Sequence, residues 1–117
     1  MALAEALPRQ ERLRKRSEFT AVQGRGKKLH TERFLVFVLP RAQASLPTRL
    51  GITVSKKVGG AVVRNRVKRL VREAFRRRKA LFPHGLDVVF IAKKEALDVE
   101  LDGLLREVEK LCRKLPR

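Results

Sequence analysis

Residues 61–82 limit the possible folds more than any other part of the sequence. If they form an α-helix, with about 100° between successive residues, their apolar side chains gather on one side of it. Such a stripe is buried against other structure, so the helix has to cover a sheet or another helix. Pro83 and Gly85 predict its end. The stripe consists of Val63, Val67, Leu70, Val71, Ala74, Phe75, Leu81 and Phe82.

The remaining surface of this helix is strongly cationic. Nine of the sixteen residues from 64 to 79 are Lys or Arg, and Glu73 is the only acid among them. Like charges four residues apart destabilise a helix, whereas a phosphate backbone would neutralise them and release counterions. The wheel places Asn65, Lys68, Arg69, Arg72 and Arg76 opposite the apolar stripe, with Arg64 and Arg66 at its two margins.

The net charge of the whole chain also indicates a polyanionic partner. The 117 residues include 29 Lys and Arg but only 12 Asp and Glu, for a net charge of +17. Such an excess opposes compaction through self-repulsion. Nucleic acid is the first candidate partner and an anionic membrane the second, while a solvated basic face is the alternative without a partner. A strand precedes the cationic helix, which does not fit a helix-turn-helix, so RNA read through phosphates and shape is favoured.

The other apolar patterns predict a small α+β domain. The expected order is helix, strands, helix, strand, helix, with the helices packed on one sheet. We expect residues 1–117 to form a single RNA-binding domain, with residues 1–8 disordered. In the strand at 49–55, alternate residues face the core and a ligand face. The expected elements are a helix from Glu11 that Gly24 and Gly26 end, strands at 34–39, 49–55 and 86–92, and a last helix with Asp98 as N-cap. Ser17 and Glu18 could instead cap a shorter helix within the first of these segments.

The sequence also limits location and covalent chemistry. It has no run of about 18 uncharged apolar residues that could span a bilayer, and its start does not resemble a signal peptide. Cys112 is the only cysteine, so no intramolecular disulfide can form. It falls on the apolar stripe of the last helix, where we expect a buried thiol. A cytoplasmic protein fits these features.

The stretch RLGITVSKKVGGAVV runs directly into RNRVKRLVREAF. In residue type and spacing, it resembles the bacterial ribonuclease P protein subunit. The matching positions are Gly51–Lys57, Gly59, Ala61, Arg64–Arg66 and Lys68–Arg69. RLRKRSEFTAVQGRGKK, RFLVFVL and LDVVFIAKK are similar to the family's first helix, second strand and last strand. The resemblance covers roughly residues 9–115.

The resemblance implies a fold that the periodicity alone does not show. It has a four-stranded sheet with a left-handed crossover around the cationic helix, the ribosomal protein S5 domain 2-like fold, and a short first strand near Lys28–Thr31. It also implies a tRNA 5′-maturation endoribonuclease in which this chain is the non-catalytic subunit. The partners would be the catalytic RNA and precursor tRNA, the cofactor Mg²⁺ held mainly by the RNA, and the protein a monomer in the complex without membrane contact.

The resemblance further implies where the RNA lies. The precursor's 5′ leader would occupy a cleft formed by Phe19, Leu35, Phe37 and Thr53, although Phe19 and Phe37 could equally be core residues. Gln23 stands where the family often has a second aromatic side chain. Which cations contact the catalytic RNA and which the leader stays open. The expected RNA-binding residues are Lys56, Lys57, Arg64, Asn65, Arg66, Lys68, Arg69, Arg72 and Arg76.

The acids and histidines do not predict a catalytic site within the protein. The acids lie mainly on helix surfaces or caps, His30 and His84 are far apart in sequence, and no P-loop is present. We therefore expect no catalytic residues and no metal ligands in the chain. The alternatives are a structural RNA-binding protein, such as a ribosomal protein, and a metal-dependent nuclease. An apolar cleft beside the cationic helix would argue against a purely structural RNA-binding protein, which needs only the basic surface. Cleavage of RNA by the protein alone would identify a nuclease.

Overall fold

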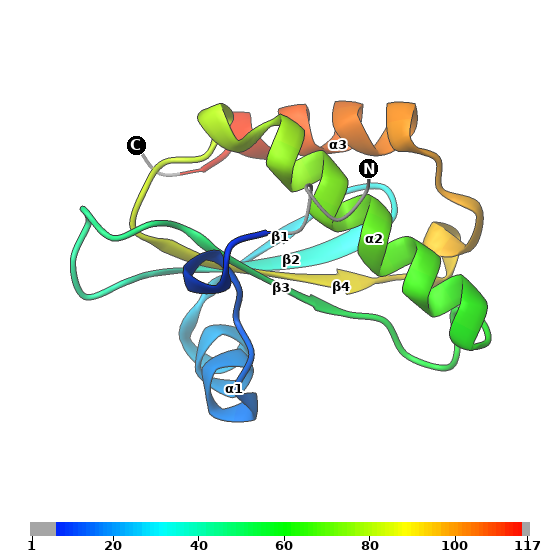
Figure 1. Cartoon of the computed structure of the whole chain (residues 1–117), viewed down its shortest axis with the longest axis horizontal. Coiled ribbons are helices and arrows are strands. Elements are labelled where there is room, and N and C mark those ends of the chain that lie inside the picture. The colour runs from blue at the N-terminus through cyan, green and yellow to red at the C-terminus, as the bar shows by residue number, and fades with distance from the viewer. Residues whose placement is uncertain (1–6, 116–117) are drawn as a thin grey trace.

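The computed structural model describes residues 7–115, which form one four-stranded sheet with helices on both faces. The strand order is β1-β2-β4-β3, with β3 parallel to β4 and the other neighbours antiparallel. Two helices, α2 and α3, cover one face of the sheet, and α1 lies on the other (Figure 1). The elements are α1 (Arg16–Arg25), β1 (Lys27–His30), β2 (Phe34–Pro40), β3 (Arg49–Thr53), α2 (Ala61–Arg77), β4 (Leu86–Ala92) and α3 (Leu101–Arg113).

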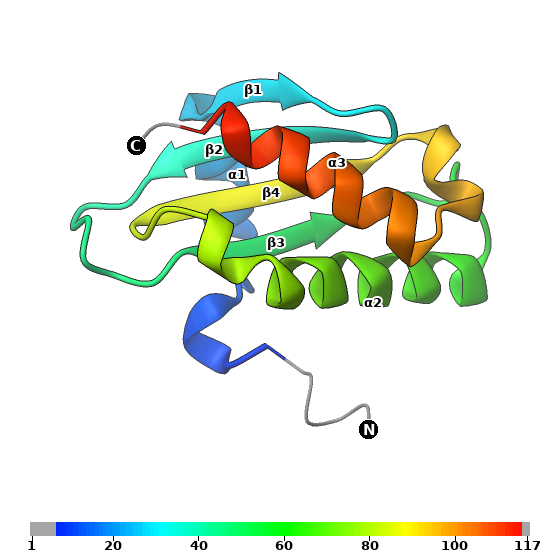
Figure 2. The same ribbon diagram turned by 90° about the horizontal axis from the view of Figure 1, so that it is seen from above.

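The connection from β3 through α2 to β4 has the rare hand. With α2 towards the viewer and both strands pointing up, β4 lies to the left of β3 (Figure 2). This is a left-handed crossover, whereas about 98% of such connections are right-handed. The α+β fold, the four strands and the crossover expected from the resemblance are thus confirmed, and β1 corresponds to the expected first strand.

The main core lies between the sheet and the helices α2 and α3. Alternate residues of β2, beginning with Phe34, are fully buried on this side, and the rings of Phe34 and Phe90 meet edge to face with centroids 5.5 Å apart. Cys112 of α3 is buried here, as expected. A smaller cluster on the other face joins Leu13, Val22 and Val89 beneath α1. Each face of the sheet therefore has its own apolar layer.

The predicted stripe of α2 is largely confirmed. Val67, Val71, Ala74 and Phe75 are buried. Leu81 is instead 38% exposed, because α2 ends at Arg77 and a separate 3₁₀ turn follows at Lys79–Leu81. The change from 3.6 to about 3 residues per turn rotates Leu81 away from the core.

The long form of the first helix and the N-cap of the last helix were predicted wrongly. The first helix begins at Arg16, near the shorter alternative, rather than at Glu11. Residues 9–11 form a 3₁₀ turn, and the chain then runs extended beside β3, where the Leu13 amide donates to the Leu50 carbonyl at 2.9 Å. The last helix begins at Leu101, since residues Lys94–Asp98 form a 3₁₀ turn and remove Asp98 from the N-cap position.

The beginning of the described chain is ordered against the main core. Leu7 is 3% exposed and packs in that core. Burying such a side chain contributes about 1.5–3 kcal/mol, which holds Leu7 on the core. Residues 1–6, where disorder was also expected, lie outside the described residues. Within residues 7–115, no helix is both long and apolar enough to cross a membrane.

Candidate nucleic-acid interface

The exposed side of α2 presents several cations without acidic partners. Asn65, Arg69 and Arg72 are exposed, and Arg64 and Lys68 are half-buried. Among residues 7–115, no acid forms an ion pair with any of these four cations. Although Arg72 is exposed, partial desolvation by neighbouring side chains, together with the charges of Arg12 and Arg69, lowers the pKa of its guanidinium. We call these four cations of α2, Arg64, Lys68, Arg69 and Arg72, the ridge. The ridge carries uncompensated positive charge, which a bound anion would neutralise.

Two of the predicted RNA-binding arginines already have partners within the protein. Arg66 donates from Nη2 to the Val99 carbonyl at 2.6 Å and so ties α2 to the segment before α3. Arg76 pairs with Glu73 at 2.7 Å, and Arg77 pairs with the same carboxylate. Hydrogen bonds from these two guanidiniums lower the pKa of Glu73. Arg66 and Arg76 thus have structural contacts that the helical wheel did not reveal.

The turn before α2 extends the cationic surface. Lys56 and Lys57 are both exposed in this turn. Gly60 is the N-cap of α2, and no acid occurs in the first helical turn. The positive end of the helix dipole therefore adds to the two lysine charges.

The strand register shows how the predicted cleft residues are arranged. Leu35 of β2 pairs with Ile91 of β4, which pairs in turn with Thr53 of β3, so these three side chains form a row on the α1 face. The adjacent row contains Phe37, Val89 and Gly51. Three of the four cleft residues expected from the resemblance thus lie on the α1 face of the sheet, and the fourth, Phe19 of α1, packs against that face.

A cavity of about 550 Å³ opens between α1, β3 and α2. Phe19 and Thr53 line it, together with Lys68 and Gln23. Leu35 and Phe37 do not line this cavity; Phe37 packs on the small cluster beneath α1, as Phe19 also does. The structure therefore joins an aromatic ring, polar side chains and a cation from α2 in one hollow. The other lining residues are Arg14, Arg16, Thr20, Ile52 and Val54.

Neither the cavity nor the ridge contains an evident metal centre. Within the described part of the chain, no three His, Cys, Asp or Glu residues are close enough to hold a metal ion. The buried Asp87 instead accepts two hydrogen bonds from Arg49, both at 2.8 Å. The interface thus offers cations, amides and apolar surface, which suit phosphate and base contacts.

Comparisons with known proteins agree with this chemistry. A family model described as ribonuclease P matches residues 7–116. The chain is 52% identical to the ribonuclease P protein component of Desulfovibrio desulfuricans, over 94% of this chain and 89% of the relative. It is 40% identical to that of Syntrophus aciditrophicus, over 95% and 92%.

Solved structures extend the agreement to three dimensions. The ribonuclease P protein from Thermotoga maritima superposes with a TM-score of 0.81 at 35% identity, over 92% of this chain and 99% of that one. The Staphylococcus aureus protein gives 0.78 at 30% identity, over 88% and 93%. The chain belongs to the bacterial ribonuclease P protein family. The resemblance found in the sequence is therefore confirmed, and family membership supports an RNA-binding role in tRNA processing as a component of a ribonuclease P holoenzyme.

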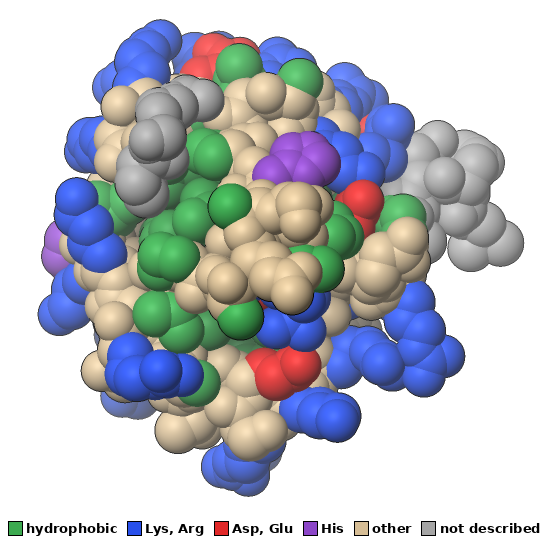
Figure 3. All heavy atoms as spheres, turned by 90° about the vertical axis from the view of Figure 1, so that its left-hand side faces the viewer, with side chains coloured by type: hydrophobic (Ala, Val, Ile, Leu, Met, Phe, Trp, Pro, Cys, Tyr) green, Lys and Arg blue, Asp and Glu red, His purple; other side chains and the backbone are tan. Residues whose placement is uncertain are grey.

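One cationic part of this chain was absent from the sequence prediction of RNA-binding residues. Arg12, Arg14 and Lys15 belong to the extended segment before α1 and line hollows beside it. The run RLRKR was visible in the sequence, but a helix assigned from Glu11 distributed its charges around a cylinder. Figure 3 shows further Lys and Arg side chains around the margin of the face at the β2–β3 loop, with hydrophobic side chains nearer its middle. Cationic surface thus extends well beyond α2.

Proposed function

We propose that this chain binds the catalytic RNA of ribonuclease P and the 5′ leader of precursor tRNA. The RNA performs the hydrolysis that leaves the mature tRNA 5′ end, with Mg²⁺ held mainly by RNA phosphates. The protein supplies binding energy and contributes no catalytic group. The observation that carries this proposal is the cavity in which Phe19 lies beside Thr53 and the cation Lys68.

The composition of this cavity suits a single strand of variable sequence. Every nucleobase has a face that can stack on an aromatic ring, and cations beside the ring hold the backbone. Phe19 provides the ring, while Lys68 and Arg14 provide charge at the wall. Leu35 and Phe37 extend the same face of the sheet towards β1. We therefore assign the leader to this face of the protein.

The ridge of α2 and the preceding turn suit a double-stranded or folded RNA. Arg69 and Arg72 are exposed and have no acidic partner in the described residues. Guanidinium groups can grip phosphate oxygens through two N–H groups at once. Lys56 and Lys57 continue this surface at the N-terminus of α2. Contacts of this type read shape and charge rather than sequence.

Reconstitution tests the proposal. The protein is mixed with a bacterial ribonuclease P RNA, and cleavage of a precursor tRNA is measured at physiological Mg²⁺. We expect faster release of the leader with both components than with RNA alone, and no cleavage by protein alone. Unchanged cleavage on adding protein would contradict a role in the holoenzyme and favour a purely structural RNA-binding protein. Cleavage by protein alone would show that the chain is itself a nuclease.

A further inference from the structure

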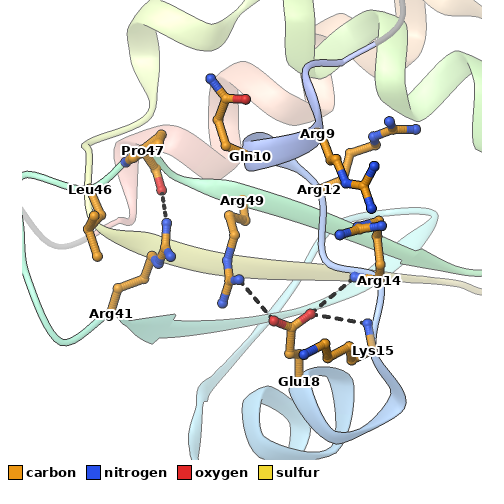
Figure 4. Close-up of a pocket in the computed structure, with 10 residues that line it drawn as sticks. All are labelled: Arg9, Gln10, Arg12, Arg14, Lys15, Glu18, Arg41, Leu46, Pro47 and Arg49. Atoms are coloured by element: carbon orange, nitrogen blue, oxygen red, sulfur yellow. Dashed lines mark hydrogen bonds and ion pairs between the residues drawn. The ribbon is translucent and has the colours of Figure 1, made fainter.

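A second hollow, of about 450 Å³, lies beside the segment that leads into α1. Figure 4 shows Arg9, Arg12 and Arg14 on one side of it, Arg41 on the other, and Arg49 between them. The side chains of Arg9, Arg12 and Arg14 form no ion pair with the described acids. This volume lies within the range of small-ligand sites. We call it the N-terminal pocket.

Among residues 7–115, Glu18 is the only acid that lines the N-terminal pocket, and its hydrogen bonds hold the wall together. Its Oε1 accepts hydrogen bonds from the backbone amides of Arg14 at 3.2 Å and Lys15 at 3.1 Å. Its Oε2 accepts from Arg49 Nη1 at 2.9 Å. One carboxylate therefore joins the extended segment, the first turn of α1 and strand β3.

The position of Arg49 is fixed independently of Glu18. Two hydrogen bonds of 2.8 Å hold its guanidinium on the buried Asp87. Burial raises the pKa of Glu18, but the amides of Lys15 and Arg14 and the Arg49 charge outweigh it, so the pKa is lowered overall. Glu18 is thus an ionised anchor between a rigid arginine and a backbone segment whose side chains carry charge into the hollow.

The N-terminal pocket also adjoins the proposed leader cavity. Arg14 lines both hollows, and Arg12 lines the N-terminal pocket together with a small space that reaches Lys68 and Arg72 of α2. Cations therefore line a series of adjoining hollows that leads from α2, past the extended segment, to the N-terminal pocket. A charged track of this kind follows a nucleic-acid backbone.

We propose that the N-terminal pocket binds phosphates of an RNA strand, and that Glu18 is the positioning residue that holds Arg14 and Lys15 in place for this contact. The inference rests on the proposed function, since it assumes that RNA is the partner. It also predicts a change in RNA affinity opposite to the one that net charge alone would give. By net charge alone, removing any acid from a protein of net charge +17 should strengthen RNA binding. Removing Glu18 should instead weaken it, because Arg14 and Lys15 would lose their fixed position.

The test compares variants with identical changes in charge. Glu18→Ala removes the anchor, and Glu18→Gln removes the charge but keeps an oxygen acceptor for the two amides. Glu95→Ala and Glu95→Gln are the matched controls, because Glu95 is exposed and forms no ion pair within residues 7–115. Dissociation constants are measured over a range of salt for the catalytic RNA alone. They are also measured for the holoenzyme with precursor tRNAs of long and short leader.

We expect Glu18→Ala to weaken binding about threefold to tenfold and to flatten the salt dependence by about one phosphate contact. Glu18→Gln should fall between this variant and the wild type, and both Glu95 variants should bind as tightly as the wild type or more tightly. A loss confined to long leaders assigns the N-terminal pocket to the leader, and a loss with catalytic RNA alone assigns it to that RNA. Unchanged or tighter binding by Glu18→Ala in every arm overturns the inference.

A second variant keeps the test valid if Glu18→Ala does not fold, as circular dichroism would show. Arg14→Ala leaves the anchor intact and should weaken the same complex by a similar factor. In the double variant with Glu18→Gln, the loss should be smaller than the product of the two single losses, since Glu18 acts through Arg14. Normal binding by Arg14→Ala overturns the inference. Failure of wild-type protein to bind RNA would instead contradict the proposed function.

Discussion

Gly51 lies directly beneath the ring of Phe19, at the junction of the small core and the proposed leader cavity. A Cβ atom at this position would lie 2.7 Å from Phe19 Cε2 and 3.1 Å from Leu13 Cβ. Both distances are shorter than van der Waals contact, so Gly51→Ala should displace the ring from the sheet. The ring is half-buried and can move outwards, into the cavity that would receive a base.

The expected cost is that of overpacking a core by one methyl group, about 1–3 kcal/mol. For a domain of this size, 1 kcal/mol lowers the melting temperature by about 4 °C. Gly51→Ala should therefore melt about 4–12 °C below the wild type. Urea unfolding and thermal melting followed by circular dichroism measure the change. Affinity for a long-leader precursor should fall as well, because the ring moves into the cavity.

Two further variants isolate the clash with Phe19. Gly24→Ala is the control, since a Cβ at this helical position meets nothing within 4 Å; it should stabilise the protein by about 0.5–1 kcal/mol. Adding Phe19→Leu to Gly51→Ala should recover part of the lost stability by removing the obstructing ring atoms. Wild-type stability in Gly51→Ala, or no coupling with Phe19→Leu, would refute the reasoning.

Three other predictions concern the cations of α2, the ring of Phe37 and the ion pairs of Glu73. Arg69→Ala with Arg72→Ala should weaken binding of the catalytic RNA and lower its salt slope by about 1.4, at roughly 0.7 per phosphate contact for a single strand and slightly more for a duplex; an equal slope would mean that the ridge faces solvent. Because Phe37 is half-buried, Phe37→Ala should lower the free energy of unfolding by less than the roughly 3–5 kcal/mol expected for a fully buried ring. It should weaken long-leader binding more than short-leader binding, and equal losses would remove Phe37 from the leader site. The folded-state pKa of Glu73 is lowered, so its contribution to stability is present above the unfolded pKa and lost as the pH falls through the folded pKa. Glu73→Gln should therefore be less stable than the wild type by urea unfolding at pH 7, and the difference should shrink as the pH falls below the unfolded-state pKa; a difference that does not change with acidification would contradict the ion-pair explanation.

The sequence predicted those elements whose burial follows a regular period. The stripe of α2 and the apolar run of β2 were correctly placed because both are packed against a continuous core. Strand β1 lacks such a pattern, since three of its four residues are exposed at a sheet edge. It was expected only through the family resemblance. The start of α1 was misplaced because the extended protein segment before it is fixed by a hydrogen bond to β3. This contact joins residues that are distant in sequence.

The candidate site was predictable to a similar extent. The wheel separated core from cationic residues on α2, but it could not show that Arg66 is bound to the Val99 carbonyl. Grouping Thr53 with Leu35 requires the strand register, which no local pattern contains. Glu18 resembled an ordinary helix-start acid in the sequence; its role in joining three elements depends on Arg49 of another strand.

The pairing of the chain before α1 with β3 has a consequence for behaviour at high concentration. The bridge between Arg12 and Leu50 covers part of the β3 edge of the sheet, whereas β1, at the other edge, has no strand pairing on its outer side within the described residues. Exposed strand edges can pair between molecules and lead to aggregation. Here each of two copies joined along β1 would carry Lys27 and Lys28 into the shared edge, and the positive charges gathered there repel one another. The same positive charge that attracts RNA therefore also keeps neighbouring protein molecules apart.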